Sequence, residues 1–225
     1  MESSLPLQFW YVSVQLLTAL VVAATGYWVY ARTETHHRMV FVGITALQFG
    51  WIATVTGRML ASGPGAKYAL SLLENALALF AVASVGYFAT VYTNRSTSPW
   101  KPRNAAAVVG VAVGLFGILT QPVLRLQYAA VSYRREPIAY LAVDPGPMYV
   151  FSVGLTVVIL GASIAYLARL FVRSPHRPTS SVALLALGGG LSLLPNAVSI
   201  FGFDAPLPGE IYTVFGTVPL TLVLG

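Results

Sequence analysis

The stretch Ala105-Ala-Ala-Val-Val-Gly-Val-Ala-Val-Gly114 contains ten consecutive residues without a charged or polar side chain. A strand of a membrane β-barrel alternates apolar and polar residues with period two, and this stretch shows no such alternation. In lipid, a single helix satisfies all of its own backbone hydrogen bonds, whereas an isolated strand cannot. The stretch therefore predicts a transmembrane helix.

Runs of the same kind recur along the whole chain. Of the 225 residues, 56% are hydrophobic and 9% are charged, whereas a soluble domain carries about 25% charged residues. A helix needs roughly 20 apolar residues to cross about 30 Å of hydrocarbon. We predict an all-α integral membrane bundle of seven transmembrane helices, at residues 9–31, 39–60, 69–92, 105–121, 148–170, 181–200 and 210–225.

The connections predict how the helices are organised. Most are short, so neighbouring helices are expected to be antiparallel, and residues 1–225 are expected to form one domain without internal repeats. Pro122 stops the fourth run, because proline cannot donate to a helix ladder. The segment from Pro122 to Pro147 is the only connection long enough to fold over a mouth of the bundle.

The basic residues predict the orientation, because Lys and Arg in short loops favour the cytoplasmic side. With the N-terminus outside and the C-terminus in the cytoplasm, eight basic residues lie in inner loops and five lie on the outer side. Six of the seven acidic residues then fall outside, which sharpens the contrast. The inner residues are Arg32, Arg38, Arg95, Lys101, Arg103, Arg169, Arg173 and Arg177.

Several functional classes are disfavoured by composition and spacing. Cysteine is absent, so disulfides, thiolate metal sites and cysteine nucleophiles are excluded. The basic residues are scattered among loops and form no stripe for nucleic acid. His36, His37 and His176 lack metal-ligand spacing, and no nucleophile–base pair or nucleotide loop is evident. We therefore expect no cofactor, no metal and no catalytic chemistry in this segment.

Polar residues near the outer ends of the runs are the candidate site. Glu74 is the one acidic residue well inside a run, and an ionisable residue at membrane depth is a functional candidate. Arg58 falls at a similar depth on the antiparallel neighbour. The predicted ligand-binding or switch residues are Arg58, Glu74, Asn75, Asn196 and Glu210. The alternatives are a purely structural ion pair, or a glutamate that reaches the interface.

Two further patterns concern the helices themselves. Pro195 and Pro219 are candidate hinges, because proline removes one helix hydrogen bond, although a simple tolerated kink is the alternative. Gly110 and Gly114 form a GxxxG step, with Gly117 on the next turn. Small residues let helices approach closely, and we expect packing within the bundle rather than dimerisation.

The chain resembles the N-terminal seven-helix membrane sensor region of prokaryotic sensor histidine kinases. The similarity extends over most of the chain and is a pattern of helices and kinks without an invariant catalytic signature. It is carried by LLENALALF (72–80), YFATVYTNR (87–95), GILTQP (117–122), GPMYVF (146–151), YLARL (166–170), LLPN (193–196) and the run containing Pro219.

The resemblance implies a signal-input domain in the cell membrane. It implies that the seventh helix passes a stimulus to cytoplasmic PAS or kinase modules of the same polypeptide, so the full-length protein is expected to be a histidine kinase. The other expected partners are the lipid bilayer, a second copy in a homodimer and an unidentified small ligand. From Glu210 to Gly225 is only about 24 Å of helix, so the seventh helix is expected to continue beyond Gly225. The alternative function is a small membrane transporter or channel.

Overall fold

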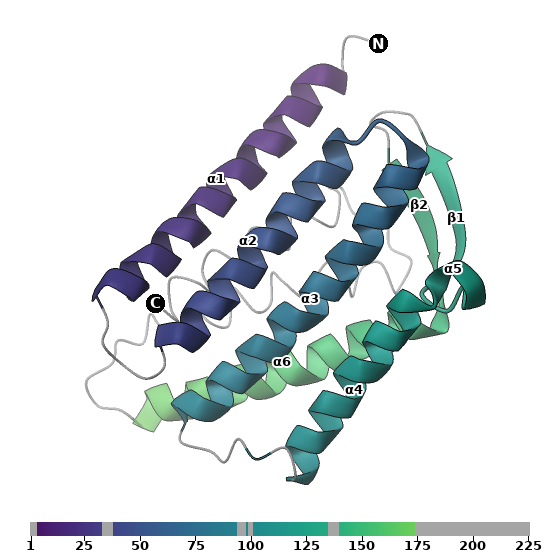
Figure 1. Cartoon of the computed structure of the whole chain (residues 1–225). Helices are drawn as coiled ribbons and strands as arrows, with labels where there is room; N and C mark the ends of the chain where they lie inside the picture. The colour runs from purple at the N-terminus through teal and green to yellow at the C-terminus, as the bar shows by residue number, and fades with distance from the viewer. Residues whose placement is uncertain (1–3, 33–37, 94–97, 99–100, 135–139, 174–225) are drawn as a thin grey trace.

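The computed structural model describes residues 4–32, 38–93, 98, 101–134 and 140–173. Five of its helices are long and apolar enough to cross a membrane, and their order is shown in Figure 1. The elements are α1 (Ser4–Arg32), α2 (Arg38–Leu60), α3 (Pro64–Tyr92), α4 (Pro102–Leu119), α5 (Gln121–Leu124), β1 (Tyr128–Arg134), β2 (Tyr140–Pro145) and α6 (Pro147–Arg173).

These five helices confirm the first five predicted runs, with shifted ends. Helix α3 begins at Pro64, five residues earlier than predicted, and α4 begins at Pro102. Proline suits the first turn of a helix because the missing N–H has no intrahelical partner there. The predicted sixth and seventh helices, with Pro195, Asn196, Glu210 and Pro219, lie outside the described residues.

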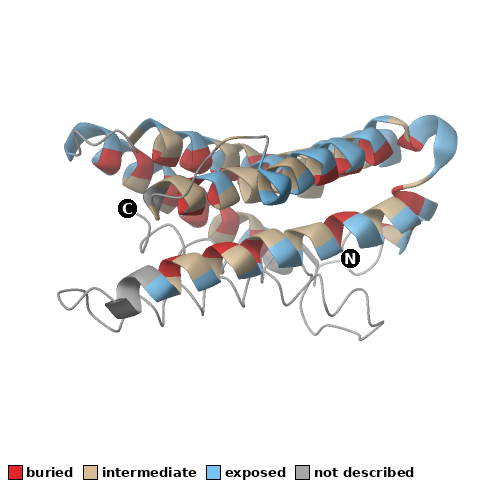
Figure 2. Cartoon of the chain, turned by 90° about the horizontal axis from the view of Figure 1, so that it is seen from below, coloured by how far each residue is buried: buried red, intermediate tan, exposed pale blue. Residues whose placement is uncertain are grey.

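The spanning helices form two layers. Helices α1, α2 and α3 lie side by side, and α4 follows α3 in the same layer (Figure 1). Helix α6 lies on the other side of this layer, where it contacts both α3 and α4. Figure 2 shows the buried positions of α6 turned toward the first layer. We call the end of the bundle where α2 ends and α3 begins the hairpin end, because strands β1 and β2 lie there (Figure 1).

Among the described residues, one cluster of buried apolar side chains packs the first layer and another joins that layer to α6. The first joins α1 to α2 through Val22, Trp51, Ile52 and others, and the second includes Phe41, Phe88 and Leu160 from α2, α3 and α6. Many apolar side chains of the spanning helices remain exposed, such as Leu20 of α1 at 65%. Exposed apolar surface of this extent suits contact with lipid rather than water.

The glycines of α4 face its neighbours within the bundle. A Cβ atom built on Gly110 would lie 2.8 Å from Leu155 of α6, and one on Gly117 would lie 2.6 Å from Met148 Cβ. A Cβ on Gly114 would come within 3.2 Å of Ser152 and 2.9 Å of Leu79 of α3. The structure therefore confirms the expected packing role of this small-residue face.

The structure departs from an all-α fold between α5 and α6. Strands β1 and β2 pair antiparallel, with Val131 opposite Val143 and Tyr133 opposite Leu141. Arg125, in the left-handed conformation at φ 51°, ends α5 just before β1. Part of the segment expected to be a connecting loop thus forms a β-hairpin, which lies beside α3 (Figure 1). Outside the hydrocarbon, the unpaired backbone groups at the edges of a two-stranded sheet can form hydrogen bonds with water. The requirement that a segment satisfy all of its own backbone groups applies only inside the hydrocarbon.

Candidate functional site

A polar stripe on the first turns of α3 forms the centre of the candidate site. Lys67, Ser71, Glu74 and Asn75 follow one another at intervals of four, three and one residues. Residues three or four apart on a helix are neighbours on one face, so these side chains share one side of α3. The stripe contacts the last turn of α2 and the first residue of the hairpin.

Glu74 forms an ion pair with Arg58 across the α2–α3 interface. Arg58 Nε lies 3.0 Å from Glu74 Oε2, and the two side chains are only 16% and 15% exposed. Because α3 begins at Pro64, Glu74 lies about 15 Å along the helix from its first residue. A charge that is largely shielded from solvent is costly without a partner, and Arg58 supplies one.

Lys67 closes the end of α2. Its Nζ donates to the carbonyl oxygens of Arg58 at 2.8 Å and Met59 at 3.3 Å. The last four carbonyls of a helix have no intrahelical partner, and a cation near them is favourable. Lys67 is 1% exposed. Through these two hydrogen bonds its ammonium group joins the start of α3 to the end of α2, including the backbone of Arg58.

A second polar contact joins α1 to the same end of α2. Thr56 Oγ1 donates to Gln15 Oε1 at 2.9 Å, and Gln15 Nε2 lies 3.2 Å from Met59 Sδ. Both Gln15 and Thr56 are buried. Three helices are therefore joined by polar contacts at the hairpin end, where buried polar groups need partners.

Tyr128, the first residue of β1, links the hairpin to the polar stripe. Its hydroxyl lies 2.8 Å from Ser71 Oγ and accepts a hydrogen bond from Asn75 Nδ2. Burial raises the pKa of Tyr128 to about 12, and the Glu74 carboxylate adds to this effect, whereas the hydrogen bonds to Ser71 and Asn75 oppose it. The phenol therefore stays neutral near pH 7 and retains its proton for hydrogen bonding.

The backbone of Tyr128 is held in place by Gln121 of α5. Gln121 Oε1 accepts from the backbone N–H groups of Gln127 at 2.6 Å and Tyr128 at 3.0 Å, while its Nε2 donates to the Tyr128 carbonyl at 3.0 Å. The Tyr128 ring also packs 6.1 Å from that of Tyr149 on α6 and 6.5 Å from that of Tyr68 on α3. Gln121 and Tyr128 thus connect the hairpin with α3, α5 and α6.

Three of the five predicted site residues come together. Arg58 and Glu74 pair directly, and Asn75 contacts Tyr128, whereas Asn196 and Glu210 lie outside the described residues. Lys67 and Ser71 were missed, although their helical spacing from Glu74 was a usable signal. Tyr128 gave no such signal, because it is 53 residues from Asn75 along the chain.

The chemical character of the site favours binding or switching over catalysis. It offers a paired carboxylate and guanidinium, a buried ammonium, and neutral hydroxyl and amide groups. Among the described residues, no group of three or more His, Asp or Glu side chains could hold a metal ion. An arrangement of this kind can hold a polar molecule or exist in two alternative pairings.

The five long apolar helices define the class of this molecule as a multi-pass helical membrane protein. The chain belongs to the family described as the N-terminal 7TM region of histidine kinases, whose model matches residues 14–224. This match confirms the resemblance drawn from the sequence, and it makes the segment a membrane sensor region rather than the catalytic part of such a kinase. No curated protein matches the chain.

Proposed function

We propose that this domain is the signal-input module of a two-component sensor histidine kinase in the cell membrane. A stimulus at the hairpin end would be passed through the seventh helix to cytoplasmic PAS or kinase modules of the same polypeptide. In this proposal the N-terminus and the hairpin are outside, and residues 1–225 form one seven-helix domain. Family membership supports this proposal over the transporter or channel alternative.

The contact of Tyr128 with the α3 stripe is the observation that carries the proposal. The hairpin follows α4 and α5 and leads directly into α6, so any displacement of Tyr128 bears on α3 and α6 together. One helical turn from Ser71, Glu74 binds Arg58 at the end of α2. A movement of the hairpin is therefore mechanically linked to the α2–α3 interface.

The proposed switch is an exchange of partners in this polar cluster. A small polar ligand that binds Glu74, Arg58 or Asn75 more tightly in one helix arrangement than in another shifts the equilibrium by that difference in affinity. Pro195 and Pro219 are the proposed hinges that convert the shift into movement of the last two helices. A homodimer would place two such modules side by side.

The test measures the autophosphorylation rate of the full-length protein in proteoliposomes, per folded molecule. The variants are Glu74→Gln, Arg58→Gln and Tyr128→Phe. Leu160→Ala is the matched control, because Leu160 is 5% exposed in the second apolar cluster and does not belong to the polar cluster. We expect the three site variants to alter the rate and the control to alter only the amount of folded protein.

An unchanged rate in all three site variants would contradict the proposal. The cluster would then be a structural brace, as the alternative interpretation of Glu74 holds. Uptake of solute by the same vesicles would instead favour the transporter function.

A further inference from the structure

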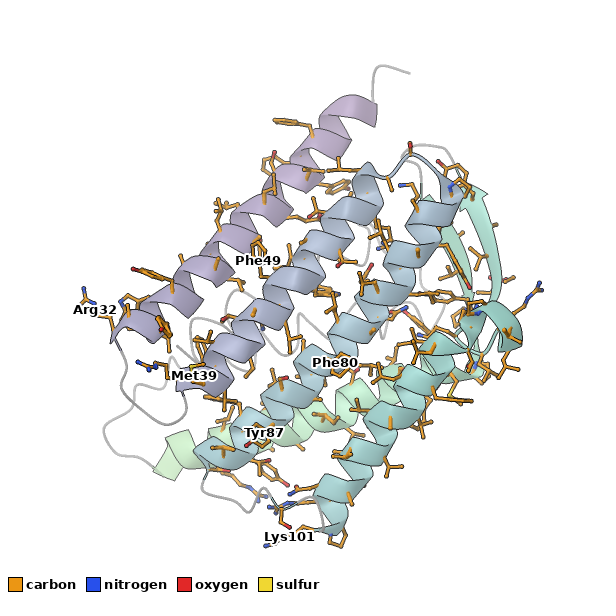
Figure 3. All side chains as sticks on the ribbon, viewed as in Figure 1. Arg32, Met39, Phe49, Phe80, Tyr87 and Lys101 are labelled. Atoms are coloured by element: carbon orange, nitrogen blue, oxygen red, sulfur yellow. The ribbon has the colours of Figure 1, made fainter. Side chains whose placement is uncertain are left out.

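An apolar groove lies between α3, α4 and α6, away from the polar cluster. Its volume is about 630 Å³, within the range of about 300–1,000 Å³ that is typical of ligand sites. Phe80 and Tyr87 of α3 lie on one wall, and Val108 of α4 lies on the other. Figure 3 shows Phe80 and Tyr87 along α3, and Lys101 where α4 begins.

The groove has the height of one membrane leaflet. Its lining residues extend from Phe80 to Thr90 on α3, which is about 15 Å of helix, and from Leu155 to Tyr166 on α6, about 16 Å. Half of a hydrocarbon layer of about 30 Å is about 15 Å. The groove therefore has the length of the acyl region of a lipid in one leaflet.

Its polar groups gather at the end opposite the hairpin. Arg103 and Asn104 line the groove at the first turn of α4, and Thr90 and Tyr166 line it near the ends of α3 and α6. Arg103 is exposed, and its Nε donates to Asn104 Oδ1 at 3.3 Å. Toward the hairpin end, by contrast, the lining residues are apolar. The groove thus combines an apolar body with a cationic mouth.

The mouth carries charge of one sign. No acidic residue is among the described residues that line the groove, and exposed Lys101 precedes Arg103 by two residues. An arginine guanidinium binds phosphate oxygens through paired N–H donors. Basic pockets between transmembrane helices favour anionic lipid headgroups for this reason.

We propose that this groove is a specific binding site for an anionic phospholipid of the leaflet in which α4 begins. The acyl chains would lie along Phe80, Val108 and Val158, and the phosphate would bind Arg103, with Lys101 adding positive charge. A neutral lipid would fill the same apolar space but would gain less at the mouth. The site is separate from the polar cluster and does not depend on the proposed signalling role.

The first arm of the test measures headgroup preference. Full-length protein is reconstituted in nanodiscs of equal phosphatidylglycerol and phosphatidylcholine, then extracted in mild detergent, and the retained lipid is counted by native mass spectrometry. We expect phosphatidylglycerol to be retained preferentially, and Arg103→Gln to lower the ratio of the two lipids about fivefold. Arg32→Gln is the control, because Arg32 is an exposed cation at the end of α1, distant from Lys101 (Figure 3).

The second arm of the test places a large side chain in the groove. Val108 and Val109 are adjacent on α4 and 60% and 59% exposed, but only Val108 lines the groove. We expect Val108→Trp to reduce retention of both lipids, and Val109→Trp to leave it unchanged. The proposal is overturned if Arg32→Gln lowers the lipid ratio as much as Arg103→Gln, if neither does so, or if the two tryptophan variants behave alike.

Discussion

Arg58 Nε lies 3.0 Å from Glu74 Oε2, so the end of α2 is tied to α3 by opposite charges that are largely shielded from solvent. The backbone of Arg58 is held separately, by Lys67 Nζ at 2.8 Å from its carbonyl oxygen. The two cations at this end of the bundle therefore have different partners. Arg58 faces the Glu74 carboxylate, and Lys67 faces backbone carbonyl oxygens of α2.

We expect the ion pair to contribute to stability as a unit. Glu74→Gln leaves the Arg58 charge without its partner and should cost about 3–5 kcal/mol, as for other buried pairs broken on one side. The double variant Arg58→Gln/Glu74→Gln removes both charges and should be less destabilised than the two single variants combined, with a coupling of about 1–3 kcal/mol. Thermal unfolding of the four proteins in detergent measures this coupling. Additive effects would mean that the two side chains do not interact.

The Tyr128 hydroxyl should stabilise the docked hairpin. Tyr128→Phe removes the group that bonds Ser71 and Asn75 and should cost about 1–3 kcal/mol, because those polar groups lose a buried partner. Tyr133→Phe is the matched control, since the Tyr133 hydroxyl makes only a 3.4 Å contact with the Ser62 carbonyl in an exposed setting. Equal losses in the two variants would contradict a special role for Tyr128.

The same tyrosine should give a pH-dependent stability. Its pKa is raised from 10.0 to about 12 in the folded protein, so between these values the unfolded chain releases a proton that the folded chain keeps. This contribution is complete below about pH 10 and is lost as the pH rises to about 12. The stability advantage of the wild type over Tyr128→Phe should shrink across that window, as measured by unfolding at several pH values. A constant difference from pH 9 to pH 12 would argue against the raised pKa.

Lys67 should act through the carbonyls of α2. Lys67→Met keeps the aliphatic stem but removes the donor to Arg58 and Met59, and it should cost about 1–3 kcal/mol. Lys101→Met removes an exposed lysine at the start of α4 and should have little effect. Hydrogen exchange of the last turn of α2 should increase in the first variant only.

Larger side chains on the small-residue face of α4 (Gly110, Gly114 and Gly117) should destabilise the protein. Gly117→Ala would place a Cβ 2.6 Å from Met148 Cβ, which cannot rotate away because it is fixed to the backbone of α6, so we expect a loss of about 1–3 kcal/mol. Gly43→Ala on α2 is the control, because nothing lies within 4 Å of its Cβ position. The control should be neutral or slightly stabilising. Thermal unfolding of both variants tests the packing.

The proposed orientation is tested separately, by accessibility. Cysteines placed at Thr35, Ser98 and Ser174 should resist membrane-impermeant thiol reagents in intact cells, whereas one at Ser132 in the exposed face of β1 should react. The motivation is the excess of basic residues in the inner loops. Reaction at the three loop positions with Ser132 protected would invert the topology.

Much of the helical architecture could be predicted from sequence because lipid restricts the backbone conformations that a spanning segment can adopt. A long apolar run must satisfy its own backbone, so the five described spans were predicted within a few residues except where prolines start a helix earlier. The hairpin was missed because its segment carries Arg134, Glu136 and Asp144 among short apolar stretches. That composition is typical of a loop as well as of an exposed hairpin.

The sequence alone determined the membrane class, the spans from α1 to α4 and α6, the packing face of α4 and the candidacy of Glu74, because these depend on local composition and helical spacing. Only the tertiary structure decided the partners. Glu74 meets Arg58 from another helix, and Tyr128 reaches Ser71 across 57 positions of the chain. Lys67, which resembles an ordinary solvated lysine in sequence, is buried because α3 extends back over the end of α2. Such contacts depend on how helices and hairpin are placed in space, and no local pattern encodes that placement.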